Sequence, residues 1–592
     1  MARHLLVQKP LTPWDGEEKA FLAGSWLAPE WTKEDYRHYN VETIPYHWDD
    51  RKKLEMDMDY AKSLVDEFLL RITAELNRIH GIKQTPRFWR ILVGEWLYLL
   101  IQITLDRTEM LKTATRLYNA KLLIEENPKL PRAQISISEF LQDIRCPNWN
   151  SEFITLLARL SEEKESNFSP VKMTGHEKCT TESKPKESRV NRTIFKLMKF
   201  FSCQLNRLKP RIQITKTYLK ITDEIRLAVK LRTIPILFQP RSISPILKNL
   251  DRGSFQLGQN GDDELKKLLS LLIPALLPIT YFEGFNYCRH KAMREFGATT
   301  PKAIVTANDF SGNELWKFWA ARSADQGSKI IILQHGGLYG INAKSLMQDY
   351  EISIADKYLS WGWSEKKFPQ VVPAPATKLV SRYKRAPSFD SVKERFLLLV
   401  TFEMPLMSYW LASMPIGPQV AEAVDLNYQI VEKLSKKIQH DLRVRTFPHD
   451  FGLKQREKLA AQFGDVCLSE QNLTFEDELK SAKLVLSTYN ATTFIESMYM
   501  NIPTIMCWDP KLWEVTPEAQ PYFDRLVKCN VLFFSASKCA DFVNLSWGNI
   551  SEWWQSDLVQ GAVHDFLNTY GYTGDDPISE ISKVIESATM AD

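Results

Sequence analysis

His335 is the residue whose type and neighbours first suggest chemistry. It lies in KIIILQHGGLYG, residues 329–340, where an apolar run leads into Gln334, His335, Gly336 and Gly337. A neutral imidazole, with an unperturbed pKa of about 6.5, can accept a proton from a hydroxyl near neutral pH. Glycines let a substrate approach the backbone closely. We therefore expect His335 to contact substrate, with Gln334, Gly336 and Gly337 as substrate-binding residues; a turn histidine bonded to the backbone is the structural alternative.

Two carboxylates compete with His335 for the role of general base. Glu283 lies in PITYFEGFNY, and Asp309 directly follows the apolar segment AIVTAN at residues 303–308. A carboxylate can take up a hydroxyl proton as an imidazole does. Asn308, beside Asp309, is a further substrate-binding candidate, and the sequence does not rank the three bases.

A second set of polar residues follows two later apolar segments. His449 comes after DLRVRTFP, and a helix is expected from Ala491, soon after KLVLST at residues 483–488. A helix N-terminus offers unpaired N–H groups and a partial positive charge, which suit a phosphate. Ordinary capping of that helix by Asn490 or Thr492 is the alternative. The nucleotide- and phosphate-binding candidates are His449, Ser487, Thr488, Asn490, Thr492 and Glu496.

These residues need a scaffold that brings distant strand ends together. In the second half of the chain, short apolar runs alternate with helical stretches of about ten residues or more, which predicts βαβ units and parallel sheets covered on both faces. Ligands of such sheets bind beyond the carboxyl ends of the strands. The expected strands are 303–308, 329–333, 396–402, 441–447, 483–488 and 502–508.

The remainder of the chain predicts a division into four regions. Residues 1–161 contain a strand at 19–24, an amphipathic helix at 57–80 and a more deeply buried helix at 88–107, so we expect a mainly helical region. Polar and charged residues without apolar period make 162–191 a linker or loop. Two α/β domains with parallel sheets are then expected at 192–388 and 389–592. The family resemblance given below implies that both are Rossmann-like, the first on the acceptor side and the second binding the nucleotide donor.

Composition excludes several classes of protein. A net charge of +4 over 592 residues does not provide the concentrated basic face that nucleic acid binding needs. The eight cysteines show no metal-ligand spacing, and reduced cytosolic thiols fit them better than disulfides. The apolar stretches 91–105 and 268–282 are shorter than the ~20 residues that span a bilayer, so core helices are expected. The N-terminus does not have a signal-peptide pattern.

A localisation follows from these exclusions. We expect a cytoplasmic protein. The basic, aromatic-containing stretch 192–211 is interpreted as a packed helix with a solvated face, and peripheral contact with the inner face of a membrane is its alternative.

The chain also resembles a known family. The segments FLAGSWL, PYHWDDRKKLEMDMDY, LNRIHGI, FWRILVGEWL, QHGGLYG, ADKYLSWGW and STYNATTFIESMYMNIPTIMCWD are similar to those of bacterial transferases associated with surface-carbohydrate biosynthesis. The resemblance runs from about residue 17 to 570, with a gap at 162–191. The second half more distantly resembles GT-B glycosyltransferases. This implies an α/β, GT-B-like fold, with two Rossmann-like domains facing a cleft and a largely helical N-terminal elaboration.

The resemblance also bears on roles. Several CMP-sugar transferases of the GT-B fold have a His-Pro pair and a Ser/Thr pair in the nucleotide-binding domain, whereas the order here is Pro448-His449, followed by Ser487-Thr488. Glycerophosphate transferases of related fold use the histidine of a His-Gly pair as base, to which His335-Gly336 is similar. GT-B enzymes commonly work without metal, so neither a metal nor a cofactor is expected beyond the nucleotide sugar.

The sequence thus predicts a glycosyltransferase that moves a sugar from a nucleotide-activated donor, a CMP-linked one being an option, to a surface polysaccharide or glycoconjugate. A phosphotransferase that uses a CDP-linked polyol is the first alternative. A non-catalytic carbohydrate-binding or scaffold protein on a degenerate GT-B fold is the second.

Overall fold

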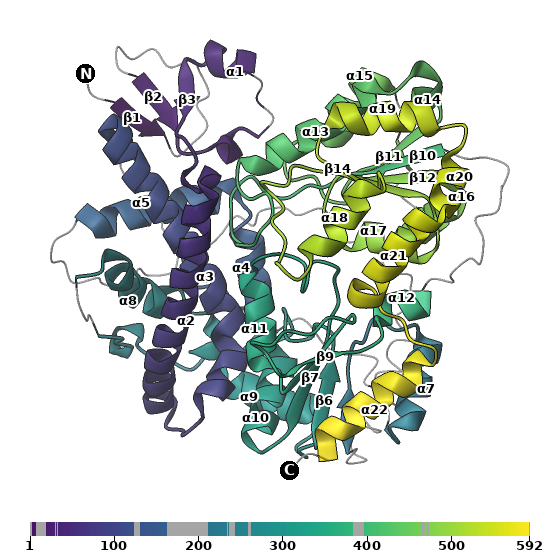
Figure 1. Ribbon diagram of the computed structural model, residues 1–592. Coiled ribbons are helices and arrows are strands. Elements are labelled where there is room, and N and C mark those ends of the chain that lie inside the picture. Colours follow the sequence, from purple (N-terminus) through teal and green to yellow (C-terminus); the bar gives the residue numbers. More distant parts are fainter. Residues whose placement is uncertain are drawn as a thin grey trace, which may run out of the picture.

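The computed structural model contains three parallel sheets surrounded by helices (Figure 1). It describes residues 3–6, 19–123 except 30 and 32, 131–162, 211–258 except 234 and 236–242, 262–382, 396–464, and 468–590 except 471 and 472. The expected linker beyond Glu162 and the basic stretch as far as Pro210 lie outside these residues.

The N-terminal region is a small sheet attached to a helical layer. Its strand order is β3-β2-β1-β4 and all pairs are parallel. The expected strand at 19–24 is β2, and three strands of three or four residues each, too short to show a period, join it. The strands are β1 (Arg3–Leu6), β2 (Lys19–Leu22), β3 (Val41–Thr43) and β4 (Ala120–Leu123).

Two long helices pack against each other beneath this sheet. The helix α2 (Arg51–His80) starts where the Asp50 carboxylate accepts from the N–H groups of Lys52 and Lys53. The helix α3 (Pro86–Tyr118) is apolar and long enough to cross a membrane, but 94% of its apolar window is buried in the protein, as expected for a core helix. The other helices here are α1 (Lys33–His38), α4 (Ile137–Asp143) and α5 (Pro147–Glu162).

The first Rossmann-like sheet has the order β5-β6-β7-β8-β9, all parallel. The last helix of the chain, α22, returns to pack on α7 and β7 of this sheet (Figure 1). The strands are β5 (Ile212–Ile214), β6 (Ala303–Thr306), β7 (Lys329–Leu333), β8 (Lys357–Ser360) and β9 (Val371–Pro373). The helices are α7 (Ile221–Lys230), α8 (Glu264–Leu276), α9 (Phe285–Phe296), α10 (Glu314–Asp325), α11 (Leu346–Ile354), α12 (Thr377–Arg382) and α22 (Pro577–Met590).

The second sheet has the doubly wound order β11-β10-β12-β13-β14, also all parallel. Its strands are β10 (Phe396–Val400), β11 (Leu442–Arg445), β12 (Ala482–Ser487), β13 (Thr504–Cys507) and β14 (Leu532–Phe533). Its helices are α13 (Gln419–Lys433), α14 (Lys436–His440), α15 (Gln455–Phe463), α16 (Phe475–Ser481), α17 (Thr492–Tyr499), α18 (Gln520–Lys528), α19 (Ala536–Ser546), α20 (Ile550–Gln555) and α21 (Asp557–Tyr570).

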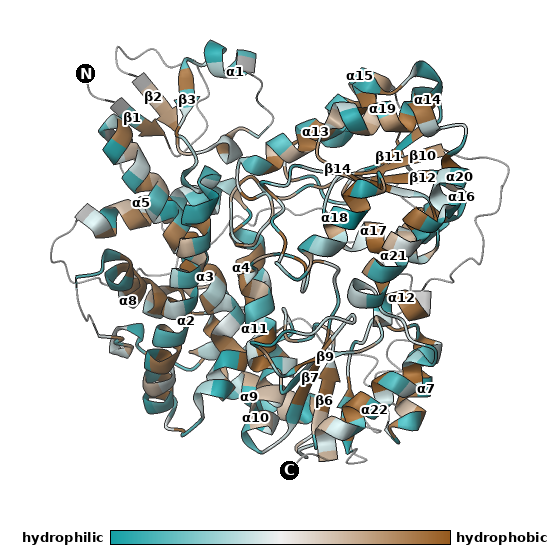
Figure 2. Ribbon diagram, in the orientation of Figure 1, coloured by the Kyte–Doolittle hydropathy of each residue, from teal (hydrophilic) through white to brown (hydrophobic). Residues whose placement is uncertain are grey.

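The inner strands of both sheets are apolar because helices cover both faces. Every residue of β6, β10 and β13 is buried, and β6 and β10 are hydrophobic in Figure 2. The chain therefore has the expected α/β, GT-B-like architecture: two Rossmann-like units with a helical N-terminal elaboration. This arrangement directs the carboxyl end of β7 toward the start of α17.

Candidate active site

A cavity of about 140 Å³ lies between the two Rossmann-like units. The turn after β7 forms one wall, the segment 410–414 a second, and the start of α17 the third. The two units are joined beside it by short antiparallel bridges, from Asn342 to Val515 and from Ser345 to Ala412. The lining residues are His335, Gly336, Gly337, Leu338, Tyr339, Asn342, Ser345, Gln348, Trp410, Ala412, Met414, Ala491 and Thr492.

Three side chains of this cavity have polar atoms that the protein does not satisfy. Among the described residues, His335 Nδ1, Trp410 Nε1 and both amide atoms of Asn342 are buried without a hydrogen-bond partner. Leaving buried polar groups unpaired costs about 1–3 kcal/mol each, so such groups gather where a ligand or water completes them. The cavity is therefore built to receive polar groups.

His335 belongs to a buried hydrogen-bond chain. The Tyr339 hydroxyl donates to Glu351 Oε1 at 2.6 Å, and its oxygen lies 3.2 Å from His335 Nε2. Because the only proton of that hydroxyl goes to Glu351, the oxygen is left to accept from an Nε2–H group. This tautomer leaves Nδ1 with its lone pair, 3.8 Å from Glu351 Oε2.

Burial makes both ionisable partners neutral at pH 7. It lowers the pKa of His335 to about 4, and the positive charges of Lys216 and Lys378 lower it further in the same direction. Burial raises the pKa of the Glu351 carboxyl to about 8, against the opposite effect of hydrogen bonds from Tyr339 and Tyr358. His335 is thus in the proton-accepting form, in a positive local field that favours anions.

Gly337 is the point of closest approach between the two units. Its N–H donates to Thr492 Oγ1 at 2.9 Å. A Cβ atom added to Gly337 would lie 2.7 Å from Ile495 Cδ1 and 2.9 Å from Thr492 Cα. Only glycine allows this contact, so the second glycine of the motif joins the units, while Gly336 lines the cavity.

The structure brings Asn308 close to His335 and leaves Glu283 elsewhere. The Asn308 amide donates to the Tyr218 hydroxyl at 2.6 Å, and the Tyr218 ring stacks 6.2 Å from the imidazole. Asp309 is buried after β6, and its charge acts on Glu224. Glu283 forms a two-pronged ion pair with Arg252 (2.6 and 2.7 Å) and does not line the cavity.

Gln334 has a structural position. Its side-chain oxygen accepts from the Trp361 N–H and from Trp363 Nε1, both at 2.8 Å, and its amide nitrogen donates to the Gly336 carbonyl at 2.7 Å. These bonds hold the turn after β7. We therefore assign Gln334 to positioning the loop, in place of the expected substrate contact.

The hydroxyls of the Ser-Thr pair also make hydrogen bonds within the protein. Ser487 and Thr488 are buried, Ser487 donates to the Tyr489 carbonyl at 3.1 Å, and Thr488 donates to Asn427 Oδ1 at 2.6 Å. Strand residues alternate between faces, and these two hydroxyls close bonds inside their own unit rather than at its edge. They do not line the cavity, contrary to the sequence-based expectation.

The start of α17 differs from the expected cap. Its N-cap residue is Ala491, which makes no side-chain capping bond. Thr492 bonds across to Gly337 instead, and the buried Asn490 amide has no hydrogen-bond partner among the described residues. The first turn therefore keeps its positive end without a side-chain cap.

Two other members of the phosphate set lie at different places. Glu496, inside α17, forms a 2.7 Å ion pair with Lys378, whose charge also acts on His335. His449 is exposed in the loop after β11, with Phe447 and Phe451 around it, and does not line the cavity.

Several site residues escaped the sequence reasoning. Tyr339 is four residues after His335, a spacing that could have been noticed in QHGGLYG. Lys216, Glu351, Lys378 and Trp410 come from separate elements, and no local pattern marks them. Among the described residues, no group of three or more His, Cys, Asp or Glu residues is placed to hold a metal ion.

Comparisons with known proteins complete this description. A family model described as LIC12162 family transferase matches residues 3–585. The crystal structure of MurG from Acinetobacter baumannii is similar to this chain with a TM-score of 0.30 and 12% identity, over 64% of this chain and 99% of that chain. A similarity of that size carries no argument about activity. The search of curated proteins found no match.

Proposed function

We propose that this chain, which belongs to the LIC12162 family of transferases, is a glycosyltransferase. It would move a sugar from a nucleotide-activated donor to a hydroxyl of a surface polysaccharide or glycoconjugate. The observation that carries the proposal is the cavity in which His335, at the end of β7, faces the first residues of α17. A proton acceptor and an anion-binding helix end are thus presented to one small volume.

The acceptor side rests on His335. In the proposed reaction, the acceptor hydroxyl gives its proton to the imidazole as its oxygen bonds to the anomeric carbon of the donor. The bond from that carbon to the phosphate oxygen breaks, and its electron pair leaves with the nucleotide. A lowered pKa keeps the ring unprotonated at pH 7, so that it can take up the hydroxyl proton, and the polar Glu351 carboxyl lies 3.8 Å from Nδ1.

The donor side rests on charge. The leaving phosphate gains negative charge in the transition state, and preorganised donors and cations stabilise such charge best in a site without water. The uncapped start of α17 lines the cavity, and Lys216 and Lys378 act on His335 from nearby. These groups support an anionic donor, and a CMP-linked sugar is one version of it.

Binding of the nucleotide is tested by thermal unfolding with CMP, CDP, UDP, GDP and ADP. A ligand at ~100 times its dissociation constant stabilises the folded state by ~2.7 kcal/mol. Thr493→Asp places a carboxylate in the first turn of α17, which favours the helix but repels phosphate. We expect the nucleotide-induced shift to disappear in this variant and to persist in the neutral control Thr493→Asn. An equal nucleotide-induced shift in both variants would contradict binding of the phosphate at this helix end.

The reaction itself is tested by the product formed with the nucleotide sugar that the first experiment selects. A glycosyltransferase gives a product without donor phosphorus, and His335→Gln should abolish transfer while keeping the nucleotide-induced shift. Phosphorus in the product would establish polyol-phosphate transfer instead. If His335→Gln keeps both nucleotide binding and glycosyl transfer, His335 is not the general base.

A further inference from the structure

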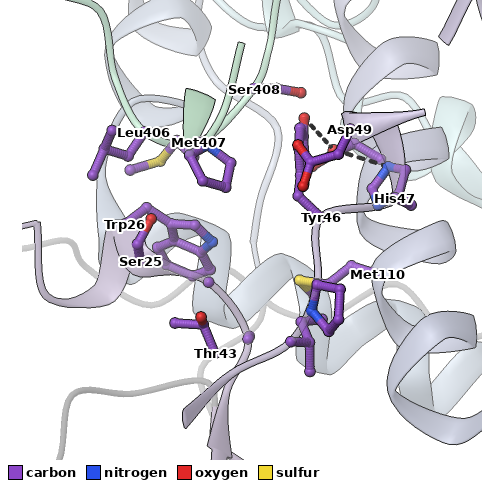
Figure 3. Close-up of a pocket in the computed structure, with 16 residues that line it drawn as sticks. Ser25, Trp26, Thr43, Tyr46, His47, Asp49, Met110, Leu406, Met407 and Ser408 are labelled. Carbon is purple, nitrogen blue, oxygen red and sulfur yellow. Dashed lines mark hydrogen bonds and ion pairs between the residues drawn. The ribbon is translucent and has the colours of Figure 1, made fainter. Parts of the chain in front are cut away.

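A second and larger cavity, of about 200 Å³, lies apart from His335. It is bordered by the N-terminal sheet, by α3 and by the segment 406–418 of the second Rossmann-like unit. Figure 3 shows Trp26, Leu406 and Met407 on one side and Tyr46, His47 and Asp49 on the other. Three parts of the chain that are far apart in sequence therefore form one partly open site, which the proposed transfer chemistry does not use.

The polar end of this cavity is organised around a buried carboxylate. Asp106 Oδ1 accepts from the Tyr46 hydroxyl at 3.1 Å and lies 3.4 Å from His47 Nε2. Asp106 also pairs with the buried Arg107, which holds the pKa of the carboxyl below its usual value against the effect of burial. The carboxylate is thus ionised and rigidly held.

The apolar side is built around an indole ring. Trp26 lies so close to Gly24 that a Cβ atom there would be 2.5 Å from both Cδ1 and Nε1 of the ring. The absence of a side chain at Gly24 therefore leaves room for the indole against the main chain, while Met407 and Met110 add apolar surface. A flat aromatic wall opposite a hydrogen-bonding end suits a ring-shaped ligand with one apolar face.

Three polar atoms of the lining residues, Ser25 Oγ, His47 Nε2 and Ser408 Oγ, are buried without a hydrogen-bond partner among the described residues. A buried hydroxyl costs free energy until something bonds to it. We propose that this cavity binds one neutral sugar residue, whose C–H face packs on Trp26 and whose hydroxyls bond to Ser25 and to the Asp106 end.

The charges argue against an ionic ligand. The guanidinium of Arg107 is already bound by Asp106, by Asn150 Oδ1 at 2.6 and 3.1 Å, and by the Ser408 carbonyl at 3.0 Å. Among the described residues that line this cavity, two are carboxylates and none is a Lys or Arg, so an entering anion would meet no lysine or arginine. The charge of Asp106, which a cation would seek, is neutralised by Arg107. A neutral ligand with several hydroxyls meets neither cost.

The segment 406–418 connects the two cavities. Leu406, Met407 and Pro418 line the sugar cavity, whereas Trp410 and Ala412 line the cavity of His335. A carbohydrate chain held in the first cavity would thus lie against the segment that walls the second. The proposed sugar site does not require transfer at His335, and it extends beyond the proposed function.

The test uses saturation-transfer NMR of the full chain with methyl glycosides of glucose, galactose, mannose and N-acetylglucosamine at millimolar concentration. Thr43→Trp fills the cavity from an exposed position at the end of β3, whereas the control Glu42→Trp places the same ring on the other face of that strand. Ser25→Ala removes a hydroxyl that has no protein partner, so the fold should not weaken.

We expect saturation transfer to at least one glycoside, lost in Thr43→Trp, reduced at least threefold in Ser25→Ala, and unchanged in Glu42→Trp and in His335→Gln. The result in His335→Gln separates sugar binding here from the proposed glycosyl transfer, because that variant removes the proposed base and leaves this cavity intact. The sugar site is refuted if saturation transfer to a glycoside survives in Thr43→Trp, or if no glycoside shows saturation transfer. It is also refuted if tetramethylammonium, and not the sugars, gives the signals.

Discussion

The lowered pKa of His335 gives a quantitative prediction about stability. The folded-state value of about 4 lies below the unfolded value of about 6.5, so the unfolded chain binds the proton first as the pH falls. The stabilising contribution is therefore complete above pH 6.5 and is lost as the pH falls toward 4. Between pH 8 and pH 5 the loss is about 2 kcal/mol.

The side chain of His335 is 23% exposed, so most of this contribution should survive solvent screening. The perturbation is His335→Gln, which cannot take up a proton. Urea unfolding at pH 5, 6, 7 and 8 measures the unfolding free energy, and the wild-type protein should lose about 2 kcal/mol more than the variant over this range.

His80 supplies a matched control. Burial also lowers its pKa to about 4, and its Nε2 lies 3.1 Å from the Tyr281 carbonyl, in the helical region. His80→Gln should therefore remove a similar pH dependence of stability and leave transfer intact, whereas His335→Gln should remove both. An identical pH dependence in the wild type and His335→Gln would refute the claim that His335 is buried in its neutral form.

Three further outcomes are expected. Gly337→Ala should destabilise the folded protein by about 1–3 kcal/mol, measured as a lower melting temperature. Gly336→Ala, whose Cβ would meet its nearest neighbour at 3.3 Å, should change the melting temperature little. Equal effects of the two substitutions would contradict the close approach at Gly337. The folded-state pKa of Glu351 is about 8, so keeping this carboxyl protonated lowers the unfolding free energy increasingly as the pH rises from 4.5. In urea titrations, Glu351→Gln should therefore stabilise the protein by about 2–3 kcal/mol at pH 7 and by little at pH 4. A destabilised variant at pH 7 would show that the carboxyl is ionised. Lys378→Met leaves the buried Glu496 carboxylate unpaired and should lower the unfolding free energy by about 1–3 kcal/mol. The double variant with Glu496→Gln should recover most of this loss. No recovery would exclude the ion pair as its cause.

The fold was largely predictable because its signals are local. Strands such as β6, β7 and β12 are short apolar runs between helices, and a parallel sheet needs no more than that pattern. The three short strands that join β2 were missed, since three or four residues show no period. The return of α22 to the first sheet was also missed, because no sequence pattern says which sheet a terminal amphipathic helix covers.

The candidate site was predictable only in part. The strand-end rule grouped His335 with Asn308, and the expected helix start added Thr492. The structure places Thr492 at the cavity of His335 and Asn308 beside it through Tyr218. The same rule predicted Ser487 and Thr488 as phosphate-binding residues, whereas in the structure both hydroxyls donate to acceptors within their own unit. Glu283 was a carboxylate of suitable type, but Arg252, distant in sequence, engages it.

The sequence by itself determined the fold class and marked His335 as a candidate, because apolar periodicity and the glycines beside His335 act over a few residues. Tertiary structure alone decided the chemistry around them. Lys216 and Lys378 act on His335 through their charges, Glu351 lies 3.8 Å from it, and Trp410 lines the same cavity, although all four are distant from it in sequence. The proposed sugar cavity joins residues 24–26 to 406–408. Such sites depend on distances and burial, and these physical quantities exist only after the chain has packed.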